Sequence, residues 1–459
     1  MTEELTANKT PKQQVIDDLD EVLDYIQSDS MTNDQKDKMT KDTLNYFDNY
    51  VSPGWLKYRK SVSTDAAVLE WTDQDAMIHG LKGEEFIDCL GGFGIYTCGH
   101  RNQYILNAVL AQLKHQALHS QELLDPLRGY LAKAVADITP GDLEKCFFTN
   151  GGAEAVEMAL KLARIATGGR WFISTVGAFH GKSMGAISMG GKGSYRVPYI
   201  PMVQQVQHVE YGNAEDMRKA IRNLIAVGEK VAAVILEPVQ GEAGIIIPPE
   251  GYLKKVREIC DEYNVALIFD EIQCGMGRTG TMWRCEAEGV IPDIMTFGKA
   301  FGGGIMPITG VICRSKMWVQ QLIDNPWLLG SPTFGGNPVC CAAALATISY
   351  MLKEDIPGQA QKKGTYLIKK LRALATEFPE VIQKVRGVGL MIGVEFHTNE
   401  IGYSVAKGLF SRGVLTAGTL VNSKTIRFEP PAIIKYEQLD QVTTRMKEAL
   451  SDTKKEFEL

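Results

Sequence analysis

The chain has 459 residues, of which 45% are hydrophobic and 23% are charged, and its formal net charge is −6. This composition is typical of a folded globular protein with enough chain for two domains, and the acidic balance argues against a nucleic-acid-binding surface. The sequence has no apolar run long enough to span a membrane and no hydrophobic signal region, and its nine cysteines include no Cys-x-x-Cys pair, so we expect a cytoplasmic protein without disulfides or zinc.

The first 60 residues are predicted to form a helical arm. Apolar residues such as Val15 and Leu19 recur at helical spacing, and residues 44–50 give a second helical pattern. The apolar stripe of this arm is not typical of a disordered tail. Residues 68–90 change to short strand patterns, and residues 91–96 form a glycine-rich loop that carries aromatic side chains.

From about residue 110 onward, strand and helix patterns alternate. Strands are predicted at residues 145–149, 171–174, 231–236, 266–269, 294–297 and 309–313, with helices such as 153–166, 214–227 and 251–263 between them. Near-continuous apolar strands that alternate with helices predict an α/β fold with a mostly parallel sheet covered on both faces. Ligands of such sheets bind at the carboxyl ends of the strands. A long apolar helix begins after residue 337, and residues 345–459 are expected to form a separate α+β layer with strands at 390–396 and 425–428.

Lys299 lies between an apolar strand and a cluster of glycines. No other charged residue occurs between residues 294 and 312. A lysine in such surroundings is partly desolvated, which favours the neutral amine that can form a Schiff base. The alternative is a tight turn with a lysine whose amine reaches solvent, and this segment alone does not decide between the two.

Asp270 follows the apolar strand candidate at residues 266–269. A carboxylate at the end of a buried strand needs a partner, and a protonated pyridine nitrogen is a suitable one, because the carboxylate keeps that nitrogen charged. The alternatives are that Asp270 caps the following segment or pairs with Arg278.

Two further loops follow strands and carry candidate ligand-binding residues. Gly151 and Gly152 stand at the start of a predicted helix, where backbone N–H groups can bind a phosphate. Phe179 could stack on a planar cofactor, and the adjacent His180 could be a base, a stacking partner or a core residue. A simple glycine-rich connector is the alternative for the first loop, and a core position is the favoured alternative for His180.

Together these segments resemble one enzyme family. The motifs are Asn150-Gly151-Gly152-Ala153-Glu154-Ala155, Phe179-His180-Gly181-Lys182, Asp270-Glu271-Ile272-Gln273, Gly298-Lys299-Ala300 and Thr333-Phe334-Gly335-Gly336-Asn337-Pro338. In this order the sequence resembles the class III, fold-type I, pyridoxal-phosphate-dependent aminotransferases over residues 60–440. Within the family, the helical arm and residues 86–94 and 119–126 are similar to the bacterial putrescine (diamine) aminotransferases.

The resemblance implies roles around the cofactor, pyridoxal 5'-phosphate. Lys299 would attach the cofactor covalently and then carry the proton, and Asp270 would hold the pyridine nitrogen. Gln273 would lie near the ring hydroxyl. Phe179 would stack on the ring with His180 beside it.

The resemblance also implies roles around the phosphate and the substrate. Gly152 and Ala153 would present backbone N–H groups to the phosphate, and Thr333 would reach the phosphate of a neighbouring subunit, so that the enzyme is at least a homodimer. Glu242 and Arg427 would face the substrate, and Phe93 is assigned to the same side. No metal is expected.

The sequence departs from the family pattern at the phosphate site. Members usually carry serine where Gly151 stands and serine or threonine where Ala153 stands. Each missing hydroxyl could remove about 0.5–1.5 kcal/mol of binding free energy, so we expect weaker cofactor retention without loss of function.

The implied domains are a helical arm at residues 1–60, a small domain built from 61–110 and 341–459, and a large cofactor-binding domain at 111–340. The implied reaction moves the terminal amino group of putrescine or cadaverine to 2-oxoglutarate or pyruvate, a step in polyamine breakdown that releases 4-aminobutanal, which can cyclise to 1-pyrroline. The alternative is an aminotransferase for an ω-amino acid such as ornithine, acetylornithine or 4-aminobutyrate. A racemase or decarboxylase on the same scaffold would need no 2-oxo acid.

Overall fold

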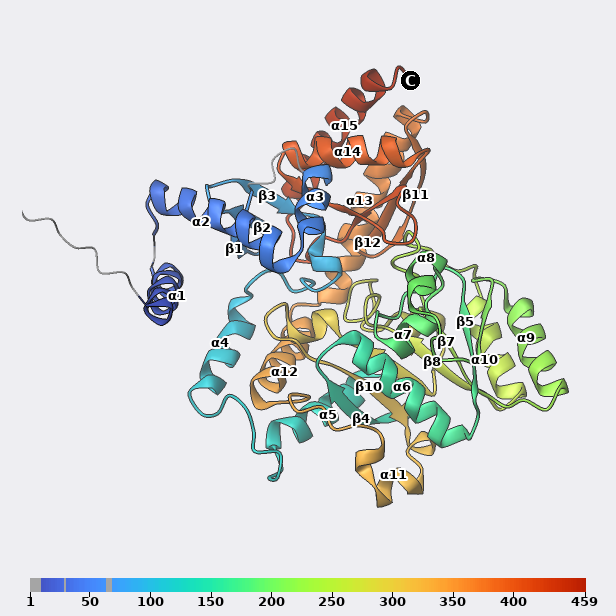
Figure 1. Cartoon of the computed structure of the whole chain (residues 1–459). Helices are drawn as coiled ribbons and strands as arrows, with labels where there is room; N and C mark the ends of the chain where they lie inside the picture. The colour runs from blue at the N-terminus through green and yellow to red at the C-terminus, as the bar shows by residue number, and fades with distance from the viewer. Residues whose placement is uncertain (1–9, 29, 63–67) are drawn as a thin grey trace, which may run out of the picture. The chain divides into compact units, whose positions relative to one another are not determined.

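The computed structural model describes residues 10–28, 30–62 and 68–459, and the chain divides into two compact units (Figure 1). The first unit comprises residues 1–72 and 79–84, and the second comprises residues 73–78 and 85–459. Residues 1–9 of the predicted arm and residues 63–67 of the predicted small domain lie outside the described residues. The two units do not correspond to the predicted arm, small domain and large domain, so the predicted domain boundaries stay a prediction.

The first unit contains the helical arm. Its helices are α1 (Pro11–Gln27), α2 (Asn33–Tyr46), the π-helix η1 (Phe47–Val51) and α3 (Pro53–Val62). Thr10 caps α1 by accepting a hydrogen bond from the backbone of Gln13, and Thr32 forms a reciprocal capping box with Gln35 at the start of α2. The helical prediction for the described part of the arm is therefore confirmed. Two short strands, β1 (Glu70–Gln74) and β2 (Met77–Gly80), follow, each with residues in both units.

A seven-stranded sheet forms the centre of the second unit. Its strand order is β4 (Leu143–Thr149), β10 (Thr309–Arg314), β9 (Ile294–Phe297), β8 (Ala266–Asp270), β7 (Val231–Leu236), β5 (Trp171–Thr175) and β6 (Val206–Val209). Only β10 runs antiparallel to its two neighbours in this sheet. The predicted mostly parallel sheet is confirmed. β6 was not predicted, because three of its four residues are only half-buried and it lacks a continuous apolar run.

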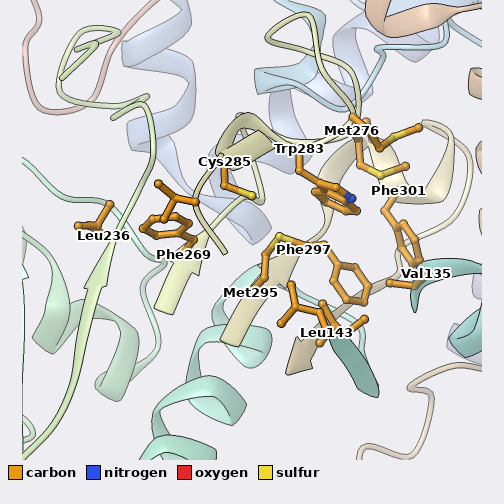
Figure 2. Close-up of a cluster of buried hydrophobic side chains, with 14 of the residues drawn as sticks. Val135, Leu143, Leu236, Phe269, Met276, Trp283, Cys285, Met295, Phe297 and Phe301 are labelled. Carbon is orange, nitrogen blue, oxygen red and sulfur yellow. The ribbon is translucent and has the colours of Figure 1, made fainter. Parts of the chain in front are cut away.

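Both faces of this sheet are covered. Residues of β8 and β9 alternate: Phe269 and Phe297 belong to one apolar cluster, whereas Ile268 and Ile294 belong to another. Figure 2 shows the first cluster, in which Phe269 and Phe297 lie with Trp283, Phe301 and Val135. This two-sided burial explains why the strand sequences are apolar throughout.

Helices from along the chain line the two clusters. The cluster of Figure 2 receives buried side chains from α4 (Gln103–Leu113), α5 (Pro126–Ile138), α9 (Ala214–Ala226), α10 (Tyr252–Glu262) and α12 (Pro338–Lys353). The opposite cluster receives them from α6 (Gly152–Thr167), α7 (Met184–Met189) and α11 (Gln320–Asp324). α8 (Gly193–Arg196) is a single turn. The long apolar helix that was predicted after residue 337 is α12, whose start is capped by the side chain of Asn337.

A second, smaller sheet and its helices form a separate core within the second unit. The sheet has the order β11 (Ile382–Val388), β12 (Met391–Phe396), β15 (Thr425–Phe428) and β14 (Ala417–Gly418), and all of its pairings are antiparallel. It packs with α13 (Ile356–Glu377), α14 (Asn399–Ser411) and α15 (Tyr436–Glu456). The strand β3 (Glu85–Asp88) pairs in parallel with β13 (Val414–Leu415), and Ile87 joins the same core. The predicted α+β layer is confirmed.

The strand directions bring several chain segments to one edge of the large sheet. β4, β5, β7, β8 and β9 share one direction, so the segments that follow them meet at their carboxyl ends. These segments begin near Asn150, Val176, Glu237, Glu271 and Gly298, and they contain most of the candidate site residues. Among the described residues, no helix is both long and apolar enough to cross a membrane.

Candidate active site

Asp270 is the last residue of β8 and is nearly fully buried, with 5% of its surface exposed. Its Oδ2 accepts a hydrogen bond from His180 Nδ1 at 2.7 Å, and its Oδ1 accepts hydrogen bonds from Thr296 Oγ1 at 3.0 Å and from the backbone N–H of Ile272 at 3.2 Å. Asp270 therefore caps the segment that follows it, as one alternative predicted, and also pairs with His180, whereas the predicted pairing with Arg278 is not formed. Arg278 instead donates to the carbonyl oxygens of buried loops.

His180 is buried and lies beside this carboxylate. Burial lowers the pKa of His180, but the hydrogen bond and charge of Asp270 outweigh that effect and leave the pKa above its ordinary value. His180 Nε2 is also buried and has no hydrogen-bond partner among the described residues. His180 is therefore a core residue, which was the favoured alternative, and its ring also orients the carboxylate of Asp270.

Lys299 follows β9 at the same sheet edge and starts the short 3-10 helix η5 (Lys299–Gly302). Its backbone adopts a left-handed conformation with φ of 47°, which is uncommon for a residue other than glycine. Burial lowers the pKa of Lys299 more than the nearby carboxylates of Glu429 and Glu242 raise it. Lys299 is therefore desolvated, as predicted, and its amine loses a proton more easily than the amine of an exposed lysine.

Glu237 is a buried site residue that the sequence analysis missed. It follows β7, and its carboxylate accepts hydrogen bonds from the backbone N–H groups of Phe179 and Gly241, each at 3.0 Å. Burial raises the pKa of Glu237 to about 7, while the charge of His180 lowers it. The sequence pattern that indicated Asp270, an acidic residue directly after an apolar strand candidate, is also present at Glu237 and could have predicted it.

The two bonds of Glu237 join two loops of the site. One loop carries Phe179 and His180, and the other, through Gly241, leads directly into Glu242. Phe179 is half-buried. Glu237 therefore couples the position of the candidate stacking residue to that of a candidate substrate residue.

The segment after β4 can form an anion site. Gly152 and Ala153 are the first two residues of α6, so their N–H groups have no partner within the helix. The carboxylate of Glu154 accepts hydrogen bonds from the N–H groups of Asn150 at 2.8 Å and Gly151 at 3.1 Å. A Cβ added to Gly151 would meet no atom within 4 Å, so this side of the helix start is open.

Arg427 and Glu242 form a buried ion pair. Arg427 comes from β15 of the smaller sheet, and its Nη2 lies 2.5 Å from Glu242 Oε2. Burial raises the pKa of Glu242, but the charge and hydrogen bond of Arg427 outweigh it and lower the pKa below its ordinary value. The Phe93 ring centre lies 4.9 Å from the guanidinium carbon of Arg427. Arg427 is fully buried, so it is not a surface arginine of the smaller sheet.

Gln273 connects the strand-end residues to the loop that carries Phe93. Its Nε2 donates to the carbonyl oxygen of Phe93 at 3.2 Å and lies 3.3 Å from Glu429 Oε1. Glu429 is fully buried, and its charge favours the protonated form of Lys299. Glu429 was not among the predicted site residues, because it lies in the Pro-rich segment after β15 and its proximity is a tertiary contact.

Thr333 is the exception among the predicted site residues. It is exposed, and its carbonyl oxygen accepts a hydrogen bond from Gln121 Nε2 at 3.0 Å. Within the described residues, no hydrogen bond or ion pair joins Thr333 to the group around Lys299. Its expected role at the phosphate of a second subunit stays a prediction.

The residues present fit a planar anionic cofactor. The open start of α6 can receive a phosphate, the unpaired Nε2 of His180 is available next to Asp270, and Lys299 offers an amine with a lowered pKa at the same edge. The donor set is that of a site for a charged ring that carries an aldehyde and a phosphate.

Comparison with known proteins gives the same assignment. The model of the family Aminotransferase class-III matches residues 61–450. The structure is similar to an ornithine aminotransferase from Toxoplasma gondii that holds pyridoxal phosphate at partial occupancy, with 26% sequence identity over 99% of this chain and 100% of that chain and a TM-score of 0.83. It is also similar to an (S)-enantioselective omega-transaminase from Thermomicrobium roseum (28% identity, 84% and 93% of the two chains, TM-score 0.79) and to the acetylornithine aminotransferase from Elizabethkingia anophelis (26%, 84% and 94%, TM-score 0.72).

The chain therefore belongs to the class III aminotransferases, and it has the fold of the fold-type I pyridoxal-phosphate-dependent transferases. Its cofactor is pyridoxal phosphate, as the sequence analysis predicted. Enzymes of this class transfer an amino group between an amine and an oxo acid.

The open position at Gly151 allows a direct test of the phosphate site. We expect Gly151→Ser to tighten cofactor binding by about 0.5–1.5 kcal/mol, because the added hydroxyl can donate to a phosphate oxygen. The backbone at Gly151, with φ of −126°, accepts a serine without strain. The dissociation constant would be measured by titrating the apoenzyme with the cofactor.

Ala153→Thr is the comparison variant. A Cβ built on Gly181 would lie only 2.6 Å from the Ala153 Cβ, so a larger side chain at 153 is more crowded, and we expect a smaller gain. An unchanged affinity in Gly151→Ser would show that the missing hydroxyl does not limit cofactor retention.

Proposed function

We propose that this aminotransferase takes the terminal amino group of a diamine, putrescine or cadaverine, and transfers it to a 2-oxo acid, 2-oxoglutarate or pyruvate. With putrescine the product is 4-aminobutanal, which can cyclise to 1-pyrroline. The observation that carries the proposal is the buried pair of Arg427 and Glu242 beside Lys299. It supplies a cation for the carboxylate of an oxo acid and an anion that neutralises this cation when an amine without a carboxylate is bound.

A second candidate is an aminotransferase for an ω-amino acid such as ornithine, acetylornithine or 4-aminobutyrate. It is favoured by the similarity to ornithine and acetylornithine aminotransferases. The two candidates differ in whether the preferred amino donor carries a carboxylate, which Arg427 could bind in a two-pronged geometry. The diamine is favoured by the resemblance of residues 86–94 and 119–126 to the putrescine enzymes.

When bound, pyridoxal phosphate supplies an aldehyde that condenses with primary amines and a ring that withdraws electrons from the carbon next to the amine nitrogen. We propose that Lys299 holds it covalently and that Gly152 and Ala153 bind its phosphate through their N–H groups. Phe179 would stack on the ring, and Gln273 would lie near the ring hydroxyl. Asp270 would hold the ring nitrogen.

The proton steps fall to this chain's own residues. In the proposed reaction, the freed Lys299 Nζ would remove the proton from the carbon that bears the substrate nitrogen and would deliver it to the carbon that was the cofactor's aldehyde. Its lowered pKa suits this base role, because a neutral amine is needed at the start of the step. Asp270, oriented by His180, would face the ring nitrogen.

The same site must accept two kinds of substrate. For the diamine, Glu242 would stay paired with Arg427, as it is paired at 2.5 Å. For the oxo acid, Glu242 would swing away, and Arg427 would bind the substrate carboxylate with both prongs of its guanidinium. Phe93, whose ring lies against Arg427, would cover this end of the substrate site.

The proposed assembly is a homodimer or a higher oligomer whose active sites are shared. Thr333 of the partner subunit would complete the phosphate site. In support, Thr333 is exposed, as a residue that reaches a second subunit has to be.

A panel of amino donors tests the proposal. Putrescine, cadaverine, spermidine, ornithine and 4-aminobutyrate would each be assayed with 2-oxoglutarate and with pyruvate, and kcat/KM compared. We expect the two diamines to give the highest values. A higher value for ornithine or 4-aminobutyrate would favour the ω-amino acid candidate, and turnover without an oxo acid would contradict both.

A second test concerns the switch at Arg427. We expect Arg427→Ala to slow the half-reaction with the oxo acid by roughly 10- to 150-fold, the equivalent of about 1.5–3 kcal/mol for a charged hydrogen bond, and to slow the diamine half-reaction less. Each half-reaction would be followed in single turnovers. Arg427→Lys is the matched control, because it keeps the charge but loses the two-pronged geometry. Equal slowing of both half-reactions in Arg427→Ala would contradict the switch.

A further inference from the structure

The loop that carries Phe93 has an unusual backbone. Gly91, Gly92, Phe93 and Gly94 all adopt left-handed conformations, with φ of 61°, 57°, 62° and 100°. Glycine adopts this region without cost, but Phe93 does not, so the conformation of Phe93 is held by its surroundings.

This loop borders the proposed active site at three points. The Phe93 ring lies against Arg427, and the Phe93 carbonyl oxygen accepts a hydrogen bond from Gln273. A Cβ added to Gly94 would lie 3.6 Å from Lys299 Cδ. A shift of the loop would therefore change the contacts of Arg427, Gln273 and Lys299 together.

Asp88 fixes the beginning of the loop. This residue ends β3 and is fully buried. Its Oδ1 accepts hydrogen bonds from the N–H groups of Leu90 and Gly91, both at 2.9 Å, and its Oδ2 lies 2.8 Å from His100 Nε2. One carboxylate thus joins the loop to a histidine that the proposed reaction does not use.

His100 lies between two carboxylates. Its Nδ1 lies 2.9 Å from Asp73 Oδ2, and its ring stacks on Tyr96 with 3.7 Å between the ring centres. A neutral imidazole has one N–H and can donate to only one carboxylate, whereas the protonated ring donates to both. Burial lowers the pKa of His100, but the two carboxylates outweigh it and raise the pKa to about 9.

The other charged groups at this cluster are two arginines. Arg101 Nε lies 2.9 Å from Asp73 Oδ1, on the outer side of the cluster. Arg278 is buried, and the charge of Asp88 acts on it. Of the groups that contact both the Asp73 and the Asp88 carboxylate, His100 is the one whose protonation decides whether each carboxylate receives an N–H.

We infer that protonated His100 is a positioning residue for substrate binding, which holds Asp88 and through it the strained loop that keeps Phe93 against Arg427. Because its pKa in the folded protein lies above the ordinary value of 6.5, this stabilisation is complete below about pH 6.5 and is lost as the pH rises through about 9. Only the statement that this loop affects substrate binding rests on the proposed function.

The first test needs no substrate. Backbone hydrogen exchange of the cofactor-loaded enzyme would be compared between wild type and His100→Gln at pH 7.5. We expect roughly tenfold faster exchange at Leu90 and Gly91, as for the loss of a hydrogen bond to a charged group, and unchanged exchange in β7. Unchanged exchange at Leu90 and Gly91 would overturn the inference, whichever amine the enzyme prefers.

The second test uses Asp73→Asn, which removes one of the two carboxylates at His100 without touching the loop. In the wild type, we expect the KM for 2-oxoglutarate to rise as the pH passes about 9. Asp73→Asn should move this rise to lower pH by roughly one unit, because a nearby carboxylate favours the charged ring. A rise at the same pH in both enzymes would contradict the role of the His100 charge, even if His100→Gln failed to fold.

Discussion

The active-site edge of this enzyme depends on how buried charge is paired. Asp270 ends one apolar strand of the large sheet and Glu237 follows another, and both are almost inaccessible to solvent. An unpaired carboxylate at such a position costs several kcal/mol, so each must be held by donors. Asp270 is held by His180 and Thr296, and Glu237 is held by two backbone N–H groups. These bonds fix the loops on which the other functional side chains stand.

In the proposed reaction, the pair of Glu242 and Arg427 would couple the substrate end of the site to the amine of Lys299. Glu242 raises the pKa of Lys299, whereas Arg427 lowers it. While Glu242 and Arg427 are paired, their effects on Lys299 oppose one another. If Glu242 moves away for an oxo acid, Lys299 loses one neighbouring anion and its neutral form is favoured further, unless the incoming carboxylate replaces that charge. If the proposed switch operates, the kind of substrate bound would change the pKa of Lys299 through this one ion pair.

Much of the fold could be predicted from the sequence, because strands such as β7 and β8 are buried on both faces and are therefore apolar throughout. Lys299 and Asp270 stood out for the same reason, as charges directly after such strands. β6 was missed, because half-buried edge residues leave no clear pattern.

What the sequence could not supply were the partners. The bond between His180 and Asp270 joins residues 90 positions apart, and the one between Asp88 and His100 depends on how a loop folds back. The sequence does place Glu237, an acidic residue, directly after an apolar strand. Its structural role follows only from the hydrogen bonds that it accepts from two backbone N–H groups. Contacts of this kind follow from tertiary packing rather than from local pattern.

The proposed reaction depends on Lys299 as the residue that carries the cofactor. Reduction of the cofactor-loaded enzyme with borohydride, followed by proteolysis and mass spectrometry of the peptides, tests this role. We expect the reduced cofactor to be recovered on the peptide that contains Lys299, and we expect Lys299→Ala to carry none. Recovery of the cofactor on a different lysine, or full turnover in Lys299→Ala, would contradict it.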